Sequence, residues 1–139
     1  MEDKSLKLLV VLLKASQTIN NKVKKDMLNY GVNPTEFAVM ELLYSKGRQP
    51  IQQIGNKILL ASSSTTYVID KLVEKGFVTR NSCLEDKRIT YADLSNKGIE
   101  FMEESFPKHR IAINELFDHL SEVEKEQSIE LIKKIGLGR

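Results

Sequence analysis

Apolar residues recur every three or four positions through most of the chain, the spacing that places side chains on one face of an α-helix. Residues 5–29 follow this pattern and predict one long amphipathic helix. At ~1.5 Å per residue it would extend over roughly 36 Å, too far for a small domain to cover. We therefore expect part of its apolar face to meet another subunit. The apolar positions that repeat are Leu9, Leu12, Ile19, Val23 and Met27.

Local start and stop signals predict three more helices after the first. Asn33–Glu36 combines a capping residue, a proline at the first helical position and a glutamate at the capping-box position, which predicts a helix over 34–45. Residues 46–50 indicate a turn, and three isoleucines within 51–58 predict a short third helix. Ser63 to Lys75 is predicted to form the fourth helix.

The following segment is predicted to contain the only strands. Residues 77–80 and 88–92 are short β-prone runs joined by a polar stretch, which is typical of a hairpin with a multi-residue tip. Ser95 then caps a fifth helix, and Ser121–Glu124 is a capping box that opens the last one. The order predicts a mainly α fold with a small β wing.

The central residues 31–94 have the element order of a winged helix-turn-helix within a single domain, 1–139. In that arrangement a short helix braces the next one, whose outer face enters the major groove of DNA. Successive residues of an α-helix are rotated by about 100° around its axis, which places Thr65 and Leu72 of the fourth helix on the inward face and leaves a polar outer face. The candidate DNA-binding residues there are Ser62, Ser63, Ser64, Thr66, Tyr67 and Lys71.

Each of these candidates also has a simpler interpretation. The three serines are equally suited to capping a helix, and Thr66 and Tyr67 could be ordinary surface residues. Lys71 fits a phosphate contact or a solvated lysine equally well. DNA contact is favoured for the group because hydroxyl and aromatic side chains can bond to phosphates and base edges or touch thymine methyls.

Two stretches resemble a known family. Residues 63–78 are similar to its recognition helix and following turn, and Asp86-Lys87-Arg88, with Leu94-Ser95 and Gly98, is similar to its wing signature. The family is that of the MarR-type (multiple-antibiotic-resistance regulator) winged helix-turn-helix transcription factors, and the resemblance extends over almost the whole chain. The family usually has Arg where Lys87 stands and Thr where Ser95 stands.

The resemblance implies a homodimeric repressor on double-stranded DNA with a palindromic operator, its dimer made by residues 1–30 and 95–139. Arg88 would enter a minor groove, oriented by an ion pair with Asp86. The candidate DNA-binding residues of the wing are therefore Asp86, Lys87 and Arg88. The enhanced potential of a narrow minor groove independently favours arginine there, although a solvated turn pair is the alternative. The resemblance also implies a small-molecule effector bound between the first, second and fifth helices.

The overall charge gives no independent support for DNA binding. The chain has 21 basic and 19 acidic side chains, a formal net charge of +2. Residues 1–30 and 31–94 carry net charges of +3 and +1, and residues 95–139 carry −2. We therefore expect modest non-specific affinity for DNA and a shallow dependence on salt.

Composition and spacing favour a protein that is not an enzyme and has no metal or cofactor. We find no glycine-rich phosphate loop, no His/Cys cluster and no nucleophilic triad in the sequence. The lone Cys83 could sense oxidants, but the family's sensing cysteine lies near the start of the first helix, so an incidental wing residue is favoured. The apolar run Leu8–Leu13 is far shorter than the ~20 residues that span a bilayer, and we expect a cytoplasmic protein without a membrane partner.

A function of another class remains open, because a fold does not fix a function. The winged-helix scaffold could serve as a protein–protein interaction module without reading DNA. Substitution of Arg88 and Tyr67 would separate the two, since only the DNA-binding function predicts weaker DNA affinity.

Overall fold

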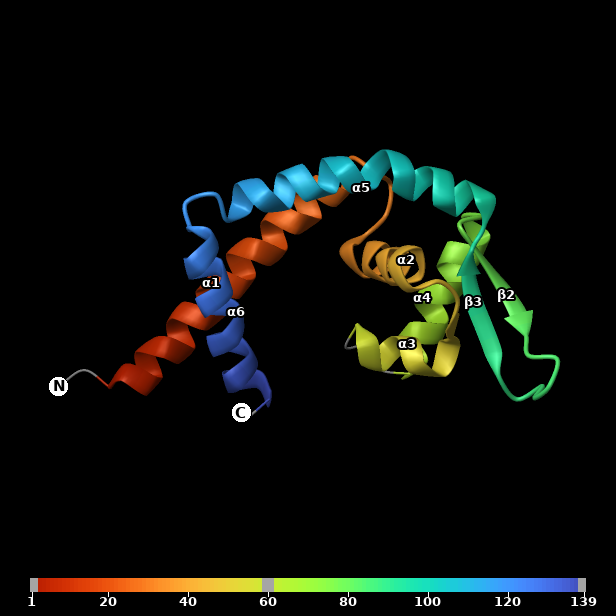
Figure 1. Cartoon of the computed structure of the whole chain (residues 1–139), viewed down its shortest axis with the longest axis horizontal. Helices are drawn as coiled ribbons and strands as arrows, with labels where there is room; N and C mark the ends of the chain where they lie inside the picture. The colour runs from red at the N-terminus through yellow and green to blue at the C-terminus, as the bar shows by residue number, and fades with distance from the viewer. Residues whose placement is uncertain (1–2, 59–61, 138–139) are drawn as a thin grey trace. The chain divides into compact units, whose positions relative to one another are not determined.

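The computed structural model describes residues 3–58 and 62–137. Within them the chain forms six helices and three strands (Figure 1), and it divides into two compact units, Met1–Pro107 and Lys108–Arg139. None of the helices in these residues is long and apolar enough to cross a membrane. The elements are α1 (Lys4–Met27), α2 (Pro34–Lys46), β1 (Gln49–Pro50), α3 (Ile51–Lys57), α4 (Ser62–Glu74), β2 (Val78–Ser82), β3 (Thr90–Leu94), α5 (Asn96–Leu116) and α6 (Glu122–Leu137).

The first two helices begin where capping side chains satisfy free backbone donors. Asp3 accepts from the backbone N–H of Ser5 at 2.9 Å. Asn33 accepts from the N–H of Glu36 at 2.8 Å, and the Glu36 carboxylate accepts from the N–H of Asn33 at 3.0 Å. The predicted capping box of α2 is therefore confirmed, and α2 starts at Pro34 as expected. The first helix ends at Met27, two residues before the predicted end.

A strand was missed by the sequence analysis. Gln49 and Pro50, predicted as part of a turn, form β1 and pair antiparallel with Ala92 and Tyr91 of β3. The sheet order is β1-β3-β2, so β1 is an edge strand, where a proline without an N–H is tolerated. The wing strands also lie one or two residues later than predicted, because pairing between Val78 and Leu94, rather than propensity, sets the register.

The core of the Met1–Pro107 unit lies among α2, α4, the sheet and the first part of α5. Tyr44 of α2 is 40% exposed and lies at the edge of this core, with its ring centre 6.1 Å from that of Phe106. Met40 of the same helix is fully buried. The buried apolar side chains are Met27, Val32, Phe37, Val39, Met40, Leu43, Ile54, Val68, Ile69, Leu72, Val78, Ala92, Leu94 and Met102.

A close backbone junction connects the end of α4 to the start of α5. The chain turns at Gly76, whose φ of 82° lies in the left-handed region that favours glycine. The Ser95 hydroxyl donates to the Gly76 carbonyl at 2.5 Å and accepts from the N–H of Gly98 at 3.0 Å. A Cβ at Gly98 would lie 2.2 Å from the carbonyl oxygen of Phe77. This close approach explains why the wing signature extends to Gly98.

The Lys108–Arg139 unit contains the end of α5 and the whole of α6. The capping box predicted at the start of the last helix is confirmed: the N–H of Ser121 donates to Glu124 at 2.9 Å, and the N–H of Glu124 donates to Ser121 at 3.1 Å. The hydrogen bond from the Ser121 backbone N–H lowers the pKa of the Glu124 carboxyl. The last helix carries several exposed apolar side chains, among them Ile129, Ile132 and Ile135.

Candidate nucleic-acid interface

The fourth helix has one buried face and one exposed face, as the sequence predicted. Ile69 and Leu72 are fully buried, and Thr65 is 2% exposed, so this side is fixed against the core. On the other side Tyr67 is 63% exposed, and Thr66 is exposed beside it. A helix held in this way presents a rigid polar surface.

The remaining candidates of α4 lie on or near this exposed side. Ser64 is exposed, and Lys71 is half-buried with its Nζ 5.5 Å from the centre of the Tyr67 ring and 3.5 Å from a Glu74 carboxylate oxygen. Ser62 and Ser63 belong to the helix, but their side chains lie outside the described residues. Lys71 and Tyr67 therefore form one surface one turn apart on the helix.

The tip of the wing holds an arginine in a fixed position. Arg88 donates through Nε and a terminal nitrogen to the two carboxylate oxygens of Asp86, at 3.0 and 3.1 Å, and its backbone N–H donates to the same carboxylate at 3.0 Å. These hydrogen bonds hold the pKa of Asp86 below its usual value. The side chain of Arg88 is nevertheless 90% exposed. The ion pair implied by the family resemblance is therefore present, and it orients the guanidinium without burying it.

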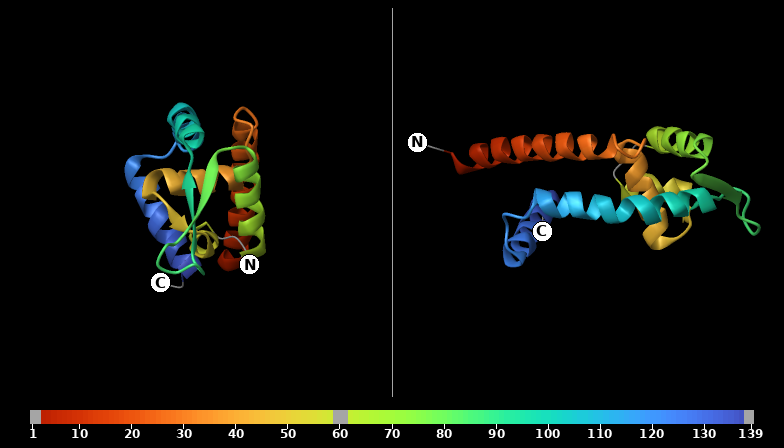
Figure 2. Two further views of the ribbon diagram at one scale, coloured as in Figure 1. Left: turned by 90° about the vertical axis from the view of Figure 1, so that its right-hand side faces the viewer. Right: turned by 90° about the horizontal axis from the view of Figure 1, so that it is seen from above.

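Contacts with the helix-turn-helix hold the wing in place. The Gln52 side chain on α3 donates to the Arg88 carbonyl at 3.2 Å. The Arg48 guanidinium lies 4.4 Å from the centre of the Tyr91 ring on β3. Together with the β1–β3 pairing, these contacts connect the wing to α3 and to the segment directly before it, while the hairpin tip projects away from α3 and α4 (Figure 2).

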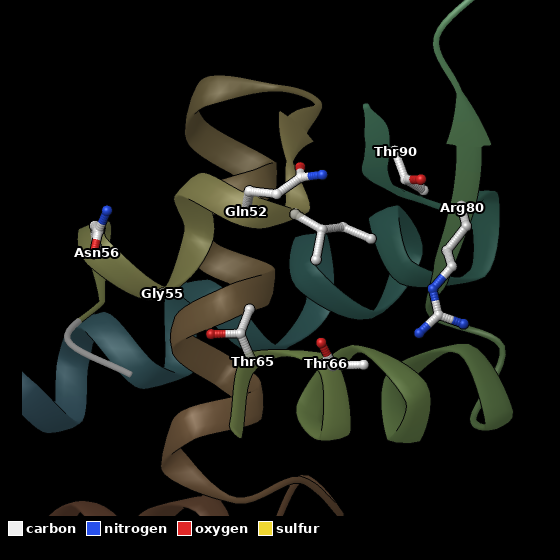
Figure 3. Close-up of a pocket in the computed structure, with 8 residues that line it drawn as sticks. Gln52, Gly55, Asn56, Thr65, Thr66, Arg80 and Thr90 are labelled. Carbon is white, nitrogen blue, oxygen red and sulfur yellow. The ribbon is translucent and has the colours of Figure 1, made fainter. Parts of the chain in front are cut away.

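A polar hollow of about 360 Å³ lies between α3, α4 and the wing strands (Figure 3). Arg80 extends from β2 towards α4, where it pairs with Asp70, and Thr66 lines the same hollow. Neither Arg80 nor Gln52 can be recognised as a site residue from the sequence, because their partners lie on elements that meet only in the fold. For Arg80, the available sequence signal was a basic residue within the first predicted wing strand, residues 77–80.

The other candidate residues of the wing have different surroundings. Lys87 is exposed next to the Asp86–Arg88 pair. Cys83 is a free, half-buried thiol just after β2. Across residues 3–58 and 62–137, no group of three or more His, Cys, Asp or Glu side chains could hold a metal ion.

The short α3 packed against α4, and a strand hairpin beside them with an arginine at its tip, define a protein of the winged helix-turn-helix class. The comparisons with known proteins narrow that class. Residues 32–90 match the model of the MarR family. The chain is 50% identical to the HTH-type transcriptional regulator MhqR of Bacillus subtilis over 137 residues, covering 99% of this chain and 94% of that protein.

One further relative and one solved structure are similar to this chain, the first in sequence and the second in fold. The transcriptional repressor MprA of Escherichia coli K12 is 30% identical, with 86% of this chain and 69% of that protein covered. The structure of Sco3205, a MarR family regulator from Streptomyces coelicolor solved in complex with DNA, superposes with a TM-score of 0.91 at 18% identity, covering 99% of this chain and 89% of that one.

The chain belongs to the MarR family. It is a DNA-binding transcriptional regulator, and regulators of this family bind DNA as dimers. Because the family consists of regulators, membership also confirms the expectation that the protein is not an enzyme.

Proposed function

We propose that a homodimer of this chain represses transcription by binding a palindromic operator, with the exposed face of α4 in the major groove and Arg88 in the flanking minor groove. The observation that carries the proposal is the exposed Arg88 held by Asp86, on the same unit as the polar face of α4. The α4 contacts are assigned to Ser62, Ser63, Ser64, Thr66, Tyr67 and Lys71, and the wing contacts to Asp86, Lys87 and Arg88.

The dimer is assigned to residues 1–30 and 95–139, which flank the DNA-binding residues 31–94. Support comes from the exposed apolar side chains on α1 and α6, because contiguous exposed apolar surface marks an interaction site. Two recognition helices related by a two-fold axis would then read half-sites about one helical turn apart, ~34–36 Å. The site of action is proposed to be the cytoplasm.

A small-molecule effector that releases the repressor from DNA is a further part of the proposal, at a site between α1, α2 and α5. Its support is family resemblance. A change in the spacing of the recognition helices would weaken binding to both half-sites at once. A ligand that binds the protein without altering operator affinity rules out this mechanism.

Fluorescence anisotropy with promoter DNA from the protein's own gene neighbourhood tests the central proposal. Specific, salt-sensitive binding that exceeds binding to a shuffled duplex of equal length supports it. Equal affinity for the two duplexes would contradict it.

Substitution of Tyr67 by alanine is expected to lower operator affinity about tenfold and to relax the sequence preference, since a base contact is worth about 1–3 kcal/mol. Affinity for the shuffled duplex should remain unchanged, because the side chain is uncharged. Anisotropy titrations of both duplexes measure the two effects. Tyr67→Phe is the matched control that separates the hydroxyl from the ring, and equal loss on both duplexes would contradict base contact.

Substitution of Arg88 by alanine is expected to weaken operator binding about tenfold, with a greater loss where the flanking sequence narrows the minor groove. Lys87→Ala removes the same charge from the neighbouring residue, so it should weaken binding evenly across flanking sequences. Titrations against A-tract and mixed flanks measure the difference. Identical profiles for the two variants would show that Arg88 acts only as a charge.

A further inference from the structure

An ion pair with a buried carboxylate holds the C-terminal end of α4. Lys75 directly follows the helix, and its Nζ lies 2.9 Å from each carboxylate oxygen of Glu36 on α2. The Glu36 side chain is only 5% exposed and that of Lys75 is 37% exposed. Recognition helices contact bases mainly through their N-terminal residues. The position of Lys75 therefore indicates a role within the protein rather than at the bases.

The same two side chains connect three segments of the Met1–Pro107 unit. The Glu36 carboxylate also accepts from the N–H of Asn33, closing the capping box at the start of α2. The Lys75 ammonium also donates to the carbonyl of Gly31, at 3.3 Å, in the turn that follows α1. The Lys75 carbonyl accepts from Lys97 on α5 at 2.8 Å. One lysine thus joins the end of α4 to both sides of the connection between α1 and α2.

A contribution to folding stability is a weak explanation for this ion pair. Buried ion pairs often contribute no more to stability than apolar residues of the same volume, because desolvation offsets their attraction. Their geometry is directional, however: the ammonium reaches both oxygens of one carboxylate and a backbone carbonyl simultaneously. Such a contact set restricts the orientation of α4 relative to the end of α1.

We propose that Glu36 and Lys75 are positioning residues that fix α4 relative to α1 and so set the half-site spacing that the dimer accepts. This inference rests on the proposed function, in which α1 belongs to the dimer interface and α4 reads DNA. In a dimer, each subunit's α4 is placed through its own α1, and a small rotation at Lys75 displaces the reading surface. Without the ion pair, only a fraction of the dimers holds the two α4 helices at the spacing that matches the half-sites of the operator.

The test uses the double variant Glu36→Gln/Lys75→Met. Glutamine keeps an oxygen that can accept from the Asn33 N–H, and methionine fills the volume of the lysine stem, while both charges are removed. Affinity is measured for the operator, for operators with one base pair inserted or deleted between half-sites, and for a single half-site. If the matching orientation falls to about one tenth of the population, operator affinity falls about tenfold.

The diagnostic readout is the ratio of affinities between correctly and incorrectly spaced operators. We expect this ratio to fall about tenfold in the double variant, because mis-spaced operators no longer meet a fixed geometry. The conservative variant Lys75→Arg, which keeps the positive charge, should retain most of the wild-type ratio. Lys46→Met, which removes one exposed charge from the end of α2, is the control and should leave the ratio unchanged.

A folded double variant with the wild-type spacing ratio would overturn the inference. Urea denaturation establishes that the variant is folded under assay conditions. If it is not, Lys75→Gln is measured instead, because a neutral and shorter side chain cannot make the same three contacts, and an unchanged ratio there also overturns the inference. Wild-type protein that shows no preference for the operator over shuffled DNA would refute the proposed function itself, and with it this inference.

Discussion

Replacing Leu9 and Leu13 together with glutamate is expected to convert the protein to monomers and to lower operator affinity at least about 100-fold, the scale of avidity gained by linking two binding sites. Both side chains are more than half exposed. With Leu6 and Val10 they occupy one face of α1, at the i, i+3, i+4 and i+7 positions of a helix. Two carboxylates placed on this face would be buried without partners in any dimer that covers it.

Sedimentation equilibrium and anisotropy measure the two effects on the same protein. Lys22→Glu is the matched control, because it changes the net charge by the same two units at another exposed position of α1. It should remain dimeric, with at most a small loss of affinity from repulsion between the added charge and DNA. A double leucine variant that stays dimeric and binds its operator normally would show that the interface lies elsewhere.

Substitution of Gly98 by alanine is expected to destabilise the fold by about 2–4 kcal/mol, a large part of the stability of a small domain. The added Cβ would lie 2.2 Å from the Phe77 carbonyl oxygen and 3.1 Å from a methyl group of Leu94. The closer atom belongs to the backbone, so the strand that leads into the wing must move. The hydrogen bonds that Ser95 makes with Gly76 and Gly98 would be lost or lengthened with it.

Urea denaturation followed by circular dichroism measures this loss of stability. Gly136→Ala provides the control, because a Cβ there has no heavy atom within 4 Å. Within a helix this change should be neutral or stabilising by up to about 1 kcal/mol. Equal unfolding midpoints for Gly98→Ala and wild type would show that the α4–α5 junction can open without cost.

Sequence alone predicted the features that depend on neighbouring residues. The capping boxes at Asn33 and Ser121 were found because both partners lie within four residues of each other. Helical periodicity predicted the exposed face of α4. The structure confirms this face, since Tyr67 is exposed and Ile69, on the other side of the helix, is fully buried. The Asp86–Arg88 pair came from resemblance to the family, and its geometry was set by the fold.

The features missed from the sequence join segments far apart along the chain. β1 forms because an edge of β3 is available to pair, and a two-residue strand has too little propensity to be recognised by itself. Arg80 meets Asp70 only because β2 runs back along α4. Gln52 reaches the wing from 36 residues away. Each of these contacts requires the tertiary fold before either partner can be assigned a role.

By itself, the sequence determined the order of the helices, their capping, the polar outer face of α4 and the family, because periodicity, caps and motif spacing are local properties. Only the tertiary structure decided how α4 is held. Its end is fixed by the Glu36–Lys75 pair, between residues 39 positions apart in the chain. The physical reason is that a carboxylate and an ammonium interact according to their distance and burial in space, and the amino-acid order records neither.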